Sequence, residues 1–128
     1  MMTPMEPRLS ALRQIAITVS DVERAVGFYR DVLGLAFLFA AGPDLAFLDA
    51  GGVRLMLTTP QGGGEVGANS LLYFAVSDID DVHAALLARG ATDERGPTRT
   101  ARMPDHELWT AFVRDPDGNV VGLMEERH

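Results

Sequence analysis

The sequence predicts an α+β fold built from two similar halves, and three observations support this prediction. First, residues 15–22 resemble residues 72–79, because both segments run apolar side chains into Val-Ser-Asp. Second, a helical pattern follows each segment and stops at a glycine. Third, strand-like runs joined by a glycine-containing turn follow each helical pattern. Each half therefore reads as a strand, a helix and further strands.

The first helix is predicted over residues 22–33. Ser20 is expected to cap its start, with Glu23 three residues later completing a capping box. Gly34 stands where a left-handed C-terminal cap is favoured. The apolar residues of this helix recur at helical spacing and form one stripe: Val22, Val26, Tyr29 and Leu33.

The second helix is predicted on the same plan. Ser77 or Asp78 is expected to cap its start, and Gly90 is expected to end it. The side chains expected to face the core are Ile79, Val82, Leu86 and Leu87.

Two strand-like runs follow each helix, joined by turns at residues 49–52 and 115–118. The runs are residues 45–48 and 53–58 in the first half, and 108–114 and 119–124 in the second. Residues 60–69 are rich in glycine and are predicted to link the halves. A longer polar segment, residues 92–107, precedes the second pair of runs. Each half is too short to bury both faces of its own sheet, so it needs the other half or a second chain.

Composition narrows the possible functions. Hydrophobic residues make up 47% of the 128 residues, and no apolar run reaches the ~20 residues of a membrane helix. The N-terminus has no secretion-signal pattern and the chain has no cysteine, so we expect a cytoplasmic protein without disulfides or thiolate chemistry. The formal net charge of −7 disfavours nucleic acid as a partner and would attract cationic compounds.

Two motifs carry a resemblance to a known family. Residues 25–35 read Ala-Val-Gly-Phe-Tyr-Arg-Asp-Val-Leu-Gly-Leu, and residues 112–119 read Phe-Val-Arg-Asp-Pro-Asp-Gly-Asn. With the internal repeat, they resemble the vicinal oxygen chelate superfamily, the glyoxalase, bleomycin resistance protein and dioxygenase group. The resemblance implies a single domain over residues 1–128, with two tandem βαβββ modules that form a curved mixed sheet around a cup. Module one then covers about residues 9–60, the linker 60–69 and module two about 70–127.

The resemblance also places four metal-ligand positions, because catalytic members of the family usually hold one divalent metal in the cup. Gln14 stands where the family uses His or Gln, and Leu71 where it uses His. Met56 and Gly122 stand where it uses Glu. Only Gln14 offers a donor suited to such an ion, and one amide oxygen cannot hold it. We therefore expect no metal and no cofactor.

Strand alternation predicts which side chains share the cup face with these four positions. Thr18 shares it with Gln14, and Arg54 shares it with Met56. Gly122, in place of a larger side chain, is expected to add room. The predicted ligand-binding residues are Gln14, Thr18, Arg54, Met56, Leu71, Tyr73, Phe112, Gly122 and Met124.

The leading hypothesis is metal-independent binding of a small hydrophobic or aromatic molecule, as in the bleomycin resistance proteins, within a homodimer. Arg54 favours an anionic or carbonyl group on that molecule, whereas the net charge favours a cation. A second hypothesis is a metal-free lyase or isomerase in which His106, with Asp105 or Glu107, exchanges protons and Arg54 binds the substrate.

Three further interpretations stay open. A glyoxalase I-like metal enzyme is disfavoured by the residues at the ligand positions. A partner-binding module with a collapsed cup is not excluded by any residue. Alternatively, Arg54 only pairs with Glu107 or Asp49, and His106 is a polar loop residue. His83 is expected to be solvated on the second helix, and His128 to be disordered.

Overall fold

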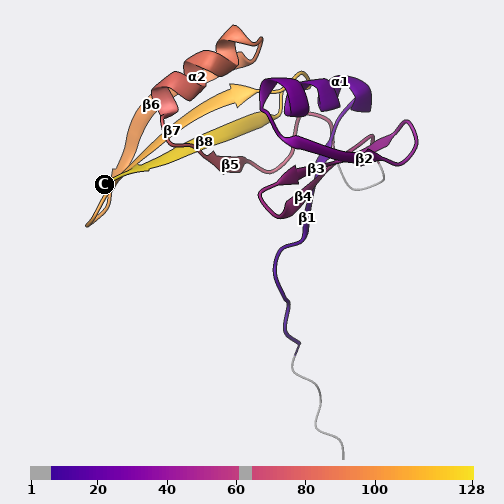
Figure 1. Cartoon of the computed structure of the whole chain (residues 1–128), viewed down its shortest axis with the longest axis horizontal. Helices are drawn as coiled ribbons and strands as arrows, with labels where there is room; N and C mark the ends of the chain where they lie inside the picture. The colour runs from indigo at the N-terminus through magenta and orange to yellow at the C-terminus, as the bar shows by residue number, and fades with distance from the viewer. Residues whose placement is uncertain (1–6, 61–64) are drawn as a thin grey trace, which may run out of the picture.

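The computed structural model describes residues 7–60 and 65–128 (Figure 1), so part of the predicted linker lies outside the described residues. The first half contains β1 (Gln14–Thr18), α1 (Val22–Val26), a π-helical turn η1 (Gly27–Val32), β2 (Ala36–Ala40), β3 (Leu45–Ala50) and β4 (Val53–Thr58). The second half contains β5 (Leu72–Ala75), α2 (Ile79–Ala88), β6 (Thr92–Arg102), β7 (Glu107–Arg114) and β8 (Val120–Arg127).

The two halves have the same topology, which confirms the predicted repeat. The first half forms sheet A in the order β1-β4-β3-β2, and the second forms sheet B in the order β5-β8-β7-β6. The pair β1–β4 in sheet A and the pair β5–β8 in sheet B are parallel. All the other neighbouring strands are antiparallel. Both sheets are therefore mixed, as the α+β prediction with two βαβββ modules requires.

One strand in each half was not identified from the residues themselves. Strand β2 lies next to β3 at the edge of sheet A, and all five of its residues are exposed. Strand β6 covers most of the segment predicted only as polar, residues 92–107, and pairs with β7 through three register shifts. Neither strand shows clear apolar alternation, because neither has one face fully buried against the core.

Each helix covers one face of its own sheet, and in Figure 1 both helices lie above their strands. Gly34 and Gly90 end the helical segments with φ of 80° and 103°, as predicted from their position. The core lies between helices and sheets and is built from Ile17, Val19, Val26, Tyr29, Leu48, Leu55, Leu57, Ile79, Leu86, Val113, Val121 and Leu123, among others.

The first helix is not capped as predicted. Asp21, rather than Ser20, is its N-cap, and its side chain accepts a hydrogen bond from the Arg24 N–H. The Ser20 hydroxyl instead donates to Asp117 of module two at 2.5 Å, and Arg24 also contacts that carboxylate at 3.1 Å. Ser20, which the local sequence pattern assigned to helix capping, therefore forms a tertiary contact instead. The second helix begins at Asp78, one of the two predicted caps.

A buried polar junction joins the two modules at Asp115. The Tyr29 hydroxyl, on the first helical segment, donates to Asp115 Oδ2 at 2.9 Å. The Asn119 backbone N–H and side-chain amide also donate to Asp115, each at 2.8 Å. Burial, and then the Asp115 charge, raise the pKa of Tyr29 well above its ordinary value, so the phenol remains a donor.

Asn69 extends this junction to the first strand. Its side-chain amide donates to Asn119 Oδ1 at 2.7 Å and to the Thr18 carbonyl at 3.2 Å. Its Oδ1 accepts from the Thr18 N–H at 3.1 Å. The end of the predicted linker therefore fixes β1 to the turn before β8.

No helix among the described residues is long and apolar enough to cross a membrane.

Replacing Tyr29 with Phe should lower the free energy of unfolding by about 1.5–3 kcal/mol, because a hydrogen bond to a buried charged group is lost. Urea denaturation measures this change. Tyr73→Phe is the matched control, since Tyr73 is half exposed and its hydroxyl has no hydrogen bond among the described residues. That control should change stability by less than about 0.5 kcal/mol. Equal losses in both variants would contradict the role given to the Tyr29–Asp115 contact.

Candidate functional site

Each sheet has a second face that points away from its helix, and the predicted ligand residues fall on these faces. Ile17, Leu55 and Leu57 are buried in the core under the first helix. Alternation along β1 and β4 therefore places Gln14, Thr18, Arg54 and Met56 on the opposite face of sheet A. In sheet B, the buried Val113, Val121 and Leu123 likewise place Tyr73, Thr110, Phe112, Gly122 and Met124 away from α2.

On sheet A, the predicted residues Gln14, Arg54 and Met56 form one cluster. Arg54 Nε donates to Gln14 Oε1 at 2.7 Å, and Gln14 Nε2 donates to the Met56 sulfur at 3.6 Å. The Arg54 guanidinium lies 4.8 Å above the centre of the Phe47 ring. Phe39 packs on the same ring, with 4.6 Å between the ring centres. This face combines a fixed cation with an aromatic surface.

On sheet B, the aromatic rings of Tyr73 and Phe112 meet edge to face at 5.7 Å. Arg95 from β6 lies over Phe112, with its guanidinium carbon 4.6 Å from the ring centre. Arg95 also donates to the Thr110 carbonyl at 2.9 Å and to the Thr110 hydroxyl. Sheet B therefore repeats the arrangement of sheet A, with an arginine placed over a phenylalanine.

Gly122 does not add room to this face, so that prediction is wrong. A Cβ at Gly122 would lie 2.8 Å from Tyr73 Cδ1 and 3.0 Å from the Leu72 carbonyl oxygen. Tyr73 is directly opposite Gly122 in the parallel β5–β8 pair, and its ring fills the space above the glycine. Glycine is needed here because the ring lies so close to the backbone.

The four family ligand positions do not fit a metal ion. The Gln14 amide is already bonded to Arg54 and Met56, and a cation placed at Gln14 would be repelled by the Arg54 guanidinium. Leu71, just before β5, offers only hydrocarbon, and Gly122 has no side chain. A divalent cation favours carboxylate or imidazole ligands, and none of the four residues supplies either.

His106 lies elsewhere, at the β6–β7 hairpin, where it contacts Asp105, one of its two predicted acidic partners, and also His128. Its Nδ1 is 2.7 Å from Asp105 Oδ1, and its ring centre is 5.2 Å from that of His128. The expectation that His128 is disordered is therefore wrong, because its ring packs beside that of His106. Asp105, His106 and His128 offer ligand atoms within 4.8 Å of one another. The hydrogen bond from His106 lowers the pKa of the Asp105 carboxyl, so Asp105 is charged at neutral pH.

The hairpin cluster and Arg54 do not form one site. Figure 1 places the C-terminus, and with it His128, at the end of sheet B away from sheet A. Arg54 contacts Gln14 and Phe47, and it forms no ion pair with Glu107 or Asp49. Glu107 instead contacts Arg99 and Arg102 at 3.3 and 3.4 Å, so it is not a partner for His106 either.

His83 is also not the solvated residue that was expected. It is buried, with only 7% of its surface exposed, and its Nε2 lies 2.9 Å from Asp93 Oδ1. This contact ties α2 to β6, because Asp93 lies at the start of that strand. A structural role in module two accounts for His83.

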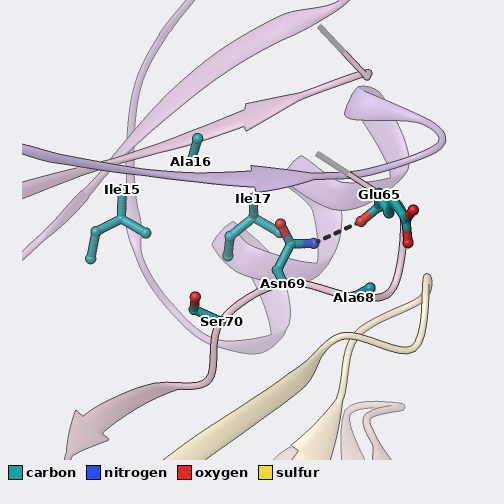
Figure 2. Close-up of a pocket in the computed structure, with 7 residues that line it drawn as sticks. All are labelled: Ile15, Ala16, Ile17, Glu65, Ala68, Asn69 and Ser70. Carbon is teal, nitrogen blue, oxygen red and sulfur yellow. Dashed lines mark hydrogen bonds between the residues drawn. The ribbon is translucent and has the colours of Figure 1, made fainter. Parts of the chain in front are cut away.

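Two hollows lie near β1, and most of the strand residues that line them belong to the core. The hollow shown in Figure 2, of about 400 Å³, lies between β1 and the last residues of the linker, and none of the nine predicted ligand residues lines it. A second hollow, of about 260 Å³, includes the predicted residues Leu71 and Tyr73. Thr18 is buried, with its backbone bonded to Asn69, and is therefore less available to a ligand than predicted.

Sequence reasoning missed two residues that the structure brings to these faces, Arg95 and Phe47. Arg95 lies in the segment interpreted only as polar, and its position over Phe112 depends on the irregular β6–β7 register. The sequence pattern places Phe47 in a strand but does not indicate on which face of the sheet its side chain lies. The alternation of β3 against β4, where Phe47 is opposite Met56, was the available signal.

Comparison with known proteins places the chain among proteins of this fold. The family model described as Glyoxalase/Bleomycin resistance protein/Dioxygenase superfamily matches residues 11–123. The uncharacterized protein YraH of Bacillus subtilis is 29% identical over 130 residues, covering 89% of this chain and 97% of YraH. The lactoylglutathione lyase of Haemophilus influenzae is 29% identical over 125 residues, covering 87% of this chain and 89% of the lyase.

Among solved structures, TnmS3, an antibiotic binding protein from a Streptomyces species, superposes with a TM-score of 0.74. It is 24% identical, and the match covers 94% of this chain and 99% of TnmS3. A lactoylglutathione lyase from Agrobacterium tumefaciens gives a TM-score of 0.73 at 24% identity, covering 92% of this chain and 95% of the lyase. The same fold therefore serves a binding protein and an enzyme.

Gly122→Ala should lower the free energy of unfolding by about 1–3 kcal/mol, because the added methyl group overlaps the Tyr73 ring and the Leu72 carbonyl. Gly96→Ala is the matched control, since a Cβ there meets only His83 at the ordinary distance of 3.9 Å. In a Tyr73→Ala background the Gly122→Ala penalty should shrink, as a double-mutant cycle by urea denaturation would measure. An unchanged penalty would show that overlap with the Tyr73 ring is not the cause of the Gly122→Ala destabilisation.

Proposed function

The chain belongs to the glyoxalase/bleomycin resistance protein/dioxygenase superfamily, and from this premise we propose that it binds a small hydrophobic or aromatic molecule without a metal ion. The proposed binding surface is the helix-free face of the two sheets. One observation carries the proposal: the family's metal-ligand positions hold groups that pack against each other. Met56 bonds to Gln14, and Gly122 lies under Tyr73.

The side chains on these faces suit an aromatic ligand. Phe39, Tyr73 and Phe112 offer ring surfaces, and Met56 and Met124 are flexible, polarizable neighbours. A few polar groups among them, such as the Arg54 guanidinium and the Tyr73 hydroxyl, can fix the orientation of a ligand. Apolar surface with few, fixed polar groups is the usual character of a small-molecule site. The fold match to an antibiotic binding protein supports the same proposal.

We propose that a second copy of the chain completes the site. Tyr73 is 49% exposed and Phe39 is 45% exposed, and both lie on the faces assigned to the ligand. The neighbouring Phe37 and Leu38 are also more than 40% exposed on the edge strand β2. Exposed aromatic surface of this kind is typical of an interaction site. A homodimer would cover part of it and enclose the ligand.

The alternative is an enzyme, and the relationship to lactoylglutathione lyases is the observation that favours it. A metal-free lyase or isomerase would need His106 and Arg54 near one substrate. Within a single chain, these residues lie on different sheets and have separate partners. A glyoxalase I-like metal enzyme would need ligands at the four positions described above. Binding without chemistry therefore agrees better with the arrangement of side chains.

A thermal-shift titration tests the absence of the family's metal site. Chelator-treated protein should show no stabilisation by manganese or iron(II), because no carboxylate or imidazole lies at the four positions. Any rise in melting temperature with zinc or nickel should come from Asp105, His106 and His128, so the His106→Ala/His128→Ala variant should abolish it. A saturable shift that persists in this variant and disappears in Gln14→Ala would restore the metal enzyme as the leading function.

A further inference from the structure

The most informative unassigned feature is the pair of arginines on the helix-free faces. Arg54 lies over Phe47, and Phe47 is directly opposite Met56 in the β3–β4 pair. Arg95 lies over Phe112, and Phe112 is directly opposite Gly122 in the β7–β8 pair. In each sheet, an arginine and a phenyl ring therefore lie beside one of the four positions identified above.

Neither arginine is neutralised by a carboxylate. The ion pairs among the described residues involve six other arginines: Arg24, Arg30, Arg99, Arg102, Arg114 and Arg127. Asp49 is opposite Arg54 in the sheet, but its carboxylate accepts from the Gly52 N–H at 3.0 Å instead. Arg8, Arg13 and Arg89 also form no ion pair among the described residues, but only Arg54 and Arg95 combine this with a position over a phenyl ring.

The hydrogen bonds of both guanidinium groups leave donors free. Arg54 uses Nε for Gln14, and its two terminal amino groups have no acceptor among the described residues. Arg95 uses Nη2 for Thr110, and its Nε and Nη1 have no acceptor in the same part of the chain. A guanidinium fork with free donors matches the geometry of a carboxylate, sulfonate or phosphate.

The phenyl rings hold the two cations in place before any ligand arrives. A guanidinium stacked on an aromatic face gains about 0.5–1 kcal/mol at an exposed site and loses part of its rotational freedom. Arg95 is restrained further by its two contacts with Thr110, which is buried. Less side-chain freedom is then lost on binding, so a preorganised cation contributes more to affinity.

We propose that the ligand of this protein is an aromatic anion whose negatively charged group is received by Arg54 on sheet A or by Arg95 on sheet B, with the neighbouring rings contacting its aromatic part. This inference rests on the proposed ligand-binding function and narrows its ligand class. It also decides between the cationic ligand that the net charge favours and the anionic group that Arg54 favours. The net charge of −7 is spread over the whole surface, whereas the fixed positive charges lie on the faces assigned to the ligand.

Two fluorescent probes that differ by one group test this inference. Anilinonaphthalene sulfonate carries a sulfonate, and phenylnaphthylamine is the same ring system without it. Fluorescence titration of the full-length protein should show the sulfonate binding about tenfold more tightly, and only its affinity should fall as salt is added. Arg54→Gln and Arg95→Gln should each remove part of the sulfonate's advantage, and the double variant should remove most of it, with the affinity for phenylnaphthylamine unchanged.

Arg89→Gln is the matched control, because it removes the same charge from an exposed residue at the end of α2 and touches neither phenyl ring. It should not change the affinity for either probe. Urea denaturation of each variant, with a midpoint close to that of the unsubstituted protein, shows that it is folded.

The outcomes separate the two proposals. Equal binding of both probes, unaffected by the Arg54→Gln/Arg95→Gln double variant, would overturn the anionic ligand and leave the proposed binding function standing. Binding of neither probe would overturn the proposed function and this inference with it. A sulfonate advantage that Arg89→Gln reduces as much as Arg95→Gln does would mean that overall charge, rather than the stacked arginines, attracts the anion, and would also overturn the inference.

Discussion

The arrangement of the two modules depends on the hydrogen bonds that the buried carboxylate of Asp115 accepts. This carboxylate accepts hydrogen bonds from Tyr29 of module one and from Asn119 of its own turn, and Asn69 continues the chain of bonds to β1. A buried charge is tolerated only when its acceptor sites are filled, so Tyr29 and Asn119 must both be in place. The Asp-Pro-Asp-Gly-Asn turn is therefore a joint between modules as well as a connection between strands.

Because each helix covers one face of its own sheet, the other face of each sheet is left for a ligand or a partner. Both faces have the same design, in which an arginine lies on a phenylalanine beside a position where the family's metal enzymes hold a ligand. The repeat accounts for the two phenylalanines, since β3 and β7 occupy the same place in the two sheets, whereas the arginines come from strands that are not equivalent, β4 and β6. Positive charge on these faces comes from fixed guanidinium groups of the chain itself.

Much of the fold could be predicted from the sequence, because its signals are local. The repeat, both helices, the glycines that end them and two strands of each hairpin follow from periodicity and turn chemistry. Strands β2 and β6 could not be predicted in this way, since edge strands without a buried face carry no alternation. The capping of the first helix was also wrong, because Ser20 contacts Asp117, a residue 97 positions away in the sequence.

The sequence by itself determined which side chains stand at the four ligand positions, and therefore that carboxylate and imidazole are missing from them. Residue identity alone decides donor chemistry. Only the tertiary structure decided what those positions contact. Tyr73 lies over Gly122, Arg95 reaches Phe112, and His106 meets His128, in each case through cross-strand neighbours that are distant in the sequence. Such contacts depend on strand register, because a shift of one residue would move each side chain to the other face of the sheet. Register is set by the packing of the whole sheet.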